Sequence, residues 1–82
     1  MKILYFAKLK QLIGKAEETI FIDKSKKVSQ VINELKNRNK NYTYAFKETK
    51  NLQYAVNCEY VDNNFLVTDD DELAIFPPVT GG

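Results

Sequence analysis

The chain has 82 residues, of which 44% are apolar and 28% are charged, and these values are typical of a single globular domain. Twelve basic residues against eleven acidic ones give a formal net charge of +1, so the overall field favours neither nucleic acid nor an anionic membrane as a partner. The absence of histidine, together with a single cysteine, excludes an internal disulfide, ordinary zinc sites and histidine-dependent nucleophilic triads.

Two strands and one helix are predicted in the first half of the chain. Residues 2–7 are mostly apolar and rich in β-favouring side chains, so we expect them to form the first strand. No positively charged leader precedes this strand, so we expect a cytoplasmic protein. Residues 8–13 allow one or two helical turns, and after Gly14 residues 17–23 predict a second strand that forms a hairpin with the first. Residues 28–38 predict the main helix, because their apolar side chains recur at helical spacing.

The second half of the chain begins with aromatic residues that alternate with smaller ones. We expect residues 42–46 to be an irregular segment that packs on the core. Residues 52–57 predict a third strand, Asn57 and Cys58 a turn, and residues 59–61 a short return strand.

Two short apolar segments complete the predicted domain. Residues 65–67 are expected to return to the core, and residues 72–76 predict the last strand after an acidic turn. The resulting order, ββαβββ, indicates an α+β domain in which one amphipathic helix covers one face of a sheet. We expect residues 1–76 to form this domain and residues 77–82 to form an extended tail.

The other face of the sheet is predicted to expose an apolar patch. Successive side chains on a strand alternate between the two faces, so Leu73 and Ile75 of the last strand are expected to point toward the helix. The side chains expected on the open face are Leu4, Phe6, Tyr60, Ala74 and Phe76. A contiguous exposed apolar patch usually marks a binding site; the alternative is that loops fold over these side chains.

The last residues combine a rigid base with a slim tip. Pro77 and Pro78 lack backbone N–H donors, so they end the strand and direct the chain away from the sheet. Gly81 and Gly82 have no Cβ atom and could pass through a channel too narrow for a side chain. The extended tail spans at most about 20 Å, which is enough to present the Gly82 carboxylate to a recessed site in another protein. The alternative is a frayed terminus.

Several segments together resemble one protein family. They are residues 3–9 (ILYFAKL), the Gly14 turn, residues 55–57 (AVN), residues 71–75 (DELAI) and the terminal sequence FPPVTGG. Along its whole length the chain is similar to the small, sulfur-carrier subunits of molybdopterin synthase, a family with the ubiquitin-like β-grasp fold and a mixed sheet. A terminal Gly-Gly alone is shared with other carriers and modifiers, whereas FPPVTGG at the end of a chain of this length is more specific.

Two positions depart from the pattern of that family. Asn57-Cys58 stands where an Asn-Gly turn is common, and Asp70 stands where glycine often occurs in an Asp-Gly-Asp turn. Both differences concern the conformation of a loop, and neither touches the tail.

The resemblance implies a sulfur donor that is not an enzyme on its own. A partner adenylyltransferase similar to ubiquitin-activating enzymes would use ATP to convert the Gly82 carboxylate into an acyl-adenylate. A sulfur donor such as a cysteine desulfurase system would then replace AMP and leave a thiocarboxylate. In the large catalytic subunit of the synthase, with which the chain would form a heterotetramer, this sulfur would attack a cyclic pyranopterin monophosphate. The chain itself is expected to bind no cofactor.

The resemblance also implies roles for particular residues. Gly81 and Gly82 correspond to the functional tip, and Phe76 corresponds to the hydrophobic anchor before it. A basic partner contact falls at Lys10, and no metal, nucleic acid or membrane is expected to bind. The complete set of expected partner-binding residues is Phe6, Lys10, Tyr60, Phe76, Pro77, Pro78, Val79 and Thr80.

Two other functions fit the same tail. One is a sulfur carrier for thiamine synthesis or tRNA thiolation. The other is a ubiquitin-like protein modifier whose terminal glycine ends in an isopeptide bond. Only the Pro-Pro-Val-Thr spacer and the Phe76 anchor separate them from the first function.

Overall fold

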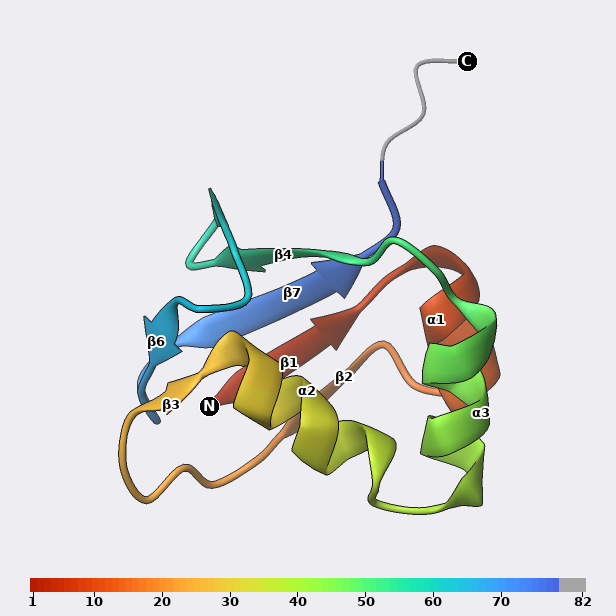
Figure 1. The fold of residues 1–82 in the computed structure, drawn as a ribbon, viewed down its shortest axis with the longest axis horizontal. Coiled ribbons are helices and arrows are strands. Elements are labelled where there is room, and N and C mark those ends of the chain that lie inside the picture. Colours follow the sequence, from red (N-terminus) through yellow and green to blue (C-terminus); the bar gives the residue numbers. More distant parts are fainter. Residues whose placement is uncertain (79–82) are drawn as a thin grey trace.

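A mixed five-stranded sheet forms the centre of the fold (Figure 1). The computed structural model describes residues 1–78. In spatial order the strands are β2 (Glu17–Thr19), β1 (Lys2–Tyr5), β7 (Glu72–Phe76), β4 (Gln53–Val56) and β5 (Glu59–Val61). Strands β1 and β7 pair in parallel, and the other neighbours are antiparallel. The C-terminal ends of the first and last strands therefore lie next to each other, at the same end of the sheet.

One face of this sheet packs against helices. The helices are α1 (Ala7–Ile13), α2 (Val28–Lys36) and α3 (Lys40–Glu48). Figure 1 shows α2 crossing the sheet, while α1 and α3 lie together near the ends of β1 and β7. All three helices contribute to a single core, whose largest fully buried side chains include Tyr5, Ile3, Leu9, Leu35, Leu73 and Ile75. The predicted packing of a main helix on one face is confirmed, and two further helices join it: α1, which has seven residues, and α3, which has nine, as many as α2.

Helix α3 shows that the prediction of an irregular segment at residues 42–46 was wrong. The side chain of Asn39 accepts a hydrogen bond from the Tyr42 backbone N–H at 3.0 Å and so caps the start of the helix. Tyr42 and Phe46 face the core, whereas Tyr44 is exposed. The alternation of aromatic residues was misleading because only two of the three belong to the buried face.

Strand β1 is shorter than predicted because helix α1 begins at Ala7. Ala7 is exposed and has a φ of 54°, so it does not share the buried face of Ile3 and Tyr5. The one or two helical turns predicted for residues 8–13 are confirmed as α1. This helix ends at Gly14, whose left-handed φ of 90° is readily adopted by glycine.

Strand β2 is also shorter than the predicted residues 17–23. Ile20 still pairs with Met1, and beyond it the chain leaves the sheet at the same end, where the Ile22 backbone N–H donates a hydrogen bond to Asp69 Oδ1 at 2.9 Å. A separate two-stranded sheet follows, formed by β3 (Lys26–Lys27) and β6 (Leu66–Val67). The buried Ile22 therefore belongs to the core without belonging to the hairpin.

The remaining elements form where they were predicted. The order ββαβββ is retained, with α1, α3, β3 and β6 added to it. The hairpin between β4 and β5 turns at Asn57 and Cys58, whose left-handed φ values of 50° and 71° are typical of a type I′ turn. Cys58 thus occupies a position that favours glycine.

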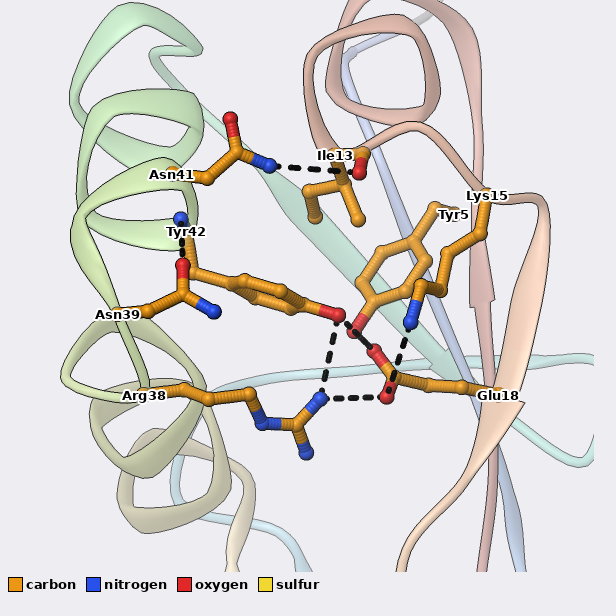
Figure 2. A network of polar contacts seen from close by, with 8 residues as sticks. All are labelled: Tyr5, Ile13, Lys15, Glu18, Arg38, Asn39, Asn41 and Tyr42. Carbon is orange, nitrogen blue, oxygen red and sulfur yellow. Dashed lines mark hydrogen bonds and ion pairs between the residues drawn. The ribbon is translucent and has the colours of Figure 1, made fainter.

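A polar network joins strand β2 to helix α3 (Figure 2). The carboxylate of Glu18 accepts hydrogen bonds from the Tyr5 hydroxyl at 2.5 Å, the Tyr42 hydroxyl at 2.7 Å and Arg38 Nη1 at 2.5 Å. Figure 2 shows both phenol rings pointing at this one carboxylate, with Lys15 forming an ion pair to it at 3.9 Å. A single side chain therefore connects the edge strand β2, its neighbour β1 and the helix α3.

These contacts determine the ionisation of Glu18. Burial acts to raise the pKa of Glu18, but the hydrogen bonds from Tyr5, Tyr42 and Arg38 outweigh it, so the pKa lies below the ordinary value of 4.5. Burial also raises the pKa of Tyr5, so its hydroxyl remains a hydrogen-bond donor at neutral pH. The pKa of Glu18 is lower in the folded protein than in the unfolded chain. The ionised network therefore stabilises the fold fully at pH values above the pKa of the unfolded chain, and this stabilisation is lost as the pH falls through the pKa of the folded protein.

We predict that Glu18→Gln lowers the free energy of unfolding at neutral pH by roughly 1–3 kcal/mol, because it removes the charge from three hydrogen bonds. Urea denaturation measures this change. The matched Glu17→Gln, which disrupts an exposed ion pair with Lys2 at 3.1 Å, should cost less than about 0.5 kcal/mol. The difference between wild type and Glu18→Gln should shrink as the pH falls through the lowered pKa of Glu18. A difference that is constant with pH would contradict the role of the carboxylate.

Candidate docking site

A shallow apolar hollow lies on the open face of the sheet, at the end of β7. Its volume is about 490 Å³. The residues that line it are Phe6, Tyr60, Ala74, Phe76, Pro77 and Pro78. None of these residues is charged, so the hollow offers a mainly apolar contact surface.

The register of the strands explains why these side chains meet. Ala74 lies beside Leu4 of β1 on one side and beside Ala55 of β4 on the other. Ala55 in turn pairs with Tyr60 of β5. Paired residues on neighbouring strands share a face, so two small alanines lie between larger aromatic and aliphatic side chains. The hollow lies where this row has two adjacent small residues between two large ones.

Phe76 connects the aromatic side chains of the hollow. Its ring contacts Phe6 at a centroid distance of 6.5 Å and Tyr60 at 5.6 Å, both in edge-on geometry. Tyr60 is 73% exposed and Phe6 is 45% exposed, so loops do not cover them. The predicted apolar patch on the open face is confirmed, and its role in binding a partner stays a prediction.

The other predicted contact residues fall into two groups. Pro77 and Pro78 line the hollow and continue β7 toward the tail. Lys10 lies exposed on α1 and does not line the hollow. The remaining predicted residues lie outside the described residues: Val79, Thr80, Gly81 and Gly82.

The hollow includes one residue that was not among the expected partner contacts. Ala74 forms part of its lining, and its place on the open face was predicted from the alternation of β7. Its small side chain leaves space where a large one would fill the hollow. The signal that could identify such a residue is a small side chain that lies on the same face as several aromatic side chains.

Two further features of residues 1–78 concern metal binding and membrane insertion. No group of three or more His, Cys, Asp or Glu side chains in this part of the chain is placed to hold a metal ion. No helix among the same residues is both long enough and apolar enough to cross a membrane. The single cysteine, Cys58, is exposed on the β4–β5 turn.

Comparison with protein families and curated proteins gives a consistent result. A model of the ThiS family matches residues 3–82. Three proteins named molybdopterin synthase sulfur carrier subunit are similar to the chain. The protein from Dictyostelium discoideum is 39% identical and covers 99% of this chain and 94% of its own length. The protein from Escherichia coli K12 is 33% identical and covers 100% of this chain and 99% of its own length. The protein from Homo sapiens is 31% identical and covers 100% of this chain and 93% of its own length.

Solved structures show the same fold. A Pyrococcus furiosus protein assigned as molybdopterin converting factor, subunit 1, superposes with a TM-score of 0.78 at 33% identity and covers 95% of each chain. Small archaeal modifier protein 1 of Haloferax volcanii has a TM-score of 0.71 at 20% identity, with 96% of this chain and 97% of that chain covered. The second likeness concerns the fold alone. The ubiquitin-like β-grasp fold predicted from the sequence is thus confirmed.

We predict that Tyr60→Ser changes the free energy of unfolding by less than about 0.5 kcal/mol, because this side chain is mostly solvated. Tyr54→Ser, on the neighbouring strand and the opposite face, should cost roughly 2 kcal/mol, because Tyr54 packs against the core. Urea denaturation of both variants tests the difference. Equal losses would mean that the open face contributes to folding and is not held free for a partner.

Proposed function

The chain belongs to the ThiS family, and we propose that it is the sulfur-carrier subunit of a molybdopterin synthase. The observation on which this proposal rests is the similarity, over nearly the whole chain, to three relatives with that name. The exposed apolar hollow at the base of the tail supports it, because a carrier must dock on other proteins to be loaded and unloaded.

In the proposed reaction Gly82 carries the sulfur. A carboxylate is inert to nucleophiles, so an activating adenylyltransferase would first join a Gly82 carboxylate oxygen to the α-phosphorus of ATP, with release of pyrophosphate. The terminal sulfur of a persulfide on a sulfur donor, such as a cysteine desulfurase system, would then attack the acyl carbon and displace AMP, and a thiol reductant would cleave the resulting acyl disulfide to leave a thiocarboxylate. In the large synthase subunit this sulfur would attack a cyclic pyranopterin monophosphate. ATP would be bound by the activating enzyme and not by this chain.

The hollow would align the tail for each of these partners. The hollow is lined by Phe76, the last residue of β7, and by Pro77 and Pro78, the first residues of the tail, so a protein that covers the hollow also surrounds the base of the tail. The two prolines restrict the directions in which the tail can leave, because each has a fixed φ. Docking would therefore place Gly82 near its target and replace a bimolecular encounter with an effectively intramolecular step.

The two alternative functions are not favoured by an observation of their own. The likeness to the small archaeal modifier protein is at a sequence identity that supports the fold alone. A carrier for thiamine synthesis or tRNA thiolation would use the same tail chemistry with a different acceptor. The fate of Gly82 therefore separates a carrier from a modifier, and the acceptor separates one carrier from another.

We predict that incubation with ATP, the activating enzyme and a sulfur source exchanges one oxygen for sulfur at Gly82. Intact-mass spectrometry detects this exchange. A variant that lacks Gly82 should show no exchange yet unfold at the same urea concentration as wild type. Attachment of the chain to lysine side chains would instead identify a protein modifier, and an unchanged mass would reject both functions.

We predict that Phe76→Ala weakens binding to the large synthase subunit by about 1–3 kcal/mol, because Phe76 is the central aromatic contact of the hollow. Isothermal titration calorimetry measures the change. Phe21→Ala is the matched control, since Phe21 is 78% exposed and does not line the hollow; it should leave the affinity unchanged. Equal affinity of the Phe76 variant and wild type would show that the hollow is not the docking surface.

A further inference from the structure

Charge is distributed very unevenly along the chain. Residues 36–50 hold five basic side chains and one acidic one, whereas residues 51–82 hold six acidic side chains and no basic one. The net charge of +1 conceals this separation. The basic segment includes helix α3, whose buried face packs on the core.

The exposed face of α3 forms a single stripe. Lys40, Thr43, Tyr44 and Lys47 are spaced i, i+3, i+4 and i+7, so they lie along one side of the helix. All four are exposed. A shallow hollow of about 490 Å³ follows this stripe, and it is lined by Asn37, Asn39, Lys40, Thr43, Tyr44 and Lys47. None of these lining residues is acidic.

The α3 stripe offers charged hydrogen-bond donors at both of its ends, Lys40 and Lys47. The two ammonium groups are donors only, and the Asn39 side-chain oxygen is already occupied by the Tyr42 N–H. The basic groups that form ion pairs among residues 1–78 are the Met1 amino terminus, Lys2, Lys15, Lys26 and Arg38. Neither ammonium group of the stripe is therefore held in an ion pair with another described residue.

Tyr44 adds an apolar surface between the two ammonium groups. Its side chain is 54% exposed, although Tyr42 and Phe46 of the same helix are buried. An exposed aromatic ring flanked by cations resembles the anchor of a protein interface, where tyrosine is enriched. The stripe thus combines an apolar contact with two unpaired positive charges.

We propose that the α3 stripe docks an acidic amphipathic helix of a partner protein. Lys40 and Lys47 are separated by seven residues, or about 10.5 Å along the helix axis. Two carboxylates seven residues apart on a partner helix have the same separation, and an aliphatic side chain between them would cover Tyr44. Charge complementarity of this kind directs the orientation of the two helices.

A protein helix fits this surface better than nucleic acid does. The affinity for nucleic acid depends on the number of phosphates neutralised, and the hollow contains only two cations. The whole chain has a pI of about 7.8, below the strongly basic values typical of nucleic-acid-binding domains. A short acidic helix requires no more than the two charges and the ring that the stripe provides.

The α3 stripe is separate from the apolar hollow at the end of β7. The two hollows share no residue, so a partner bound to α3 need not contact the residues from which the tail leaves the domain. The inference depends on the geometry and charge of α3 and not on the proposed function.

The test is an NMR titration of the ¹⁵N-labelled full chain with a helical alanine-based peptide that carries two glutamates seven positions apart and a leucine between them. The backbone amide signals of Lys40, Tyr44 and Lys47 should shift. The double variant Lys40→Gln/Lys47→Gln should bind the peptide about fivefold more weakly, as expected for the loss of two exposed ion pairs. The matched double variant Lys24→Gln/Lys27→Gln, which loses the same charge elsewhere, should bind it like wild type.

Three results would overturn the proposal. The first is an absence of shifts on α3 at millimolar peptide, or shifts confined to the lysines of α1 and β3. The second is equal binding of a control peptide with glutamine in place of both glutamates. The third is tighter binding of a deoxythymidine oligonucleotide to the same stripe, which would assign the surface to nucleic acid.

Discussion

The parallel pairing of β1 with β7 determines where the tail leaves the domain. The two strands run side by side from the pair Lys2–Glu72 to the pair Tyr5–Ile75, so both end at the same edge of the sheet. Phe6 therefore meets Phe76, and the docking hollow forms at the base of the tail. If the two strands ran in opposite directions, the side chain that follows β1 would lie at the far edge and the hollow would lose one aromatic wall.

The two faces of the sheet have different physical roles. The helix face holds the core, and the Glu18 network fastens β2 and α3 to it through charged hydrogen bonds. The open face carries exposed aromatic side chains that contribute little to the free energy of unfolding, so they remain available to a partner. Because α3 is held by its buried residues and by this network, its outer stripe is presented on a rigid element, which favours specific docking.

Local periodicity predicted the elements whose patterns are unambiguous. The main helix, the β4–β5 turn and the last strand formed where the spacing of apolar residues and turn residues placed them. The alternation of β7 also predicted the open-face patch around Phe76. Helix α3 was missed because its aromatic residues alternate like those of a strand, and its N-cap Asn39 lies in a run of polar residues that gives no clear boundary. Lys10 was chosen by resemblance and lies apart from the hollow.

The faces of β7, the end of that strand at the two prolines and the family that the terminal motif resembles could all be predicted from the sequence, because each depends on neighbours within a few positions. The convergence of Tyr5, Arg38 and Tyr42 on Glu18, and the hydrogen bonds that Asp69 accepts from the Ile22 N–H and the ammonium group of Met1, could not. These contacts join residues far apart in the chain. They depend on strand order and on the docking of α3, which no local period specifies.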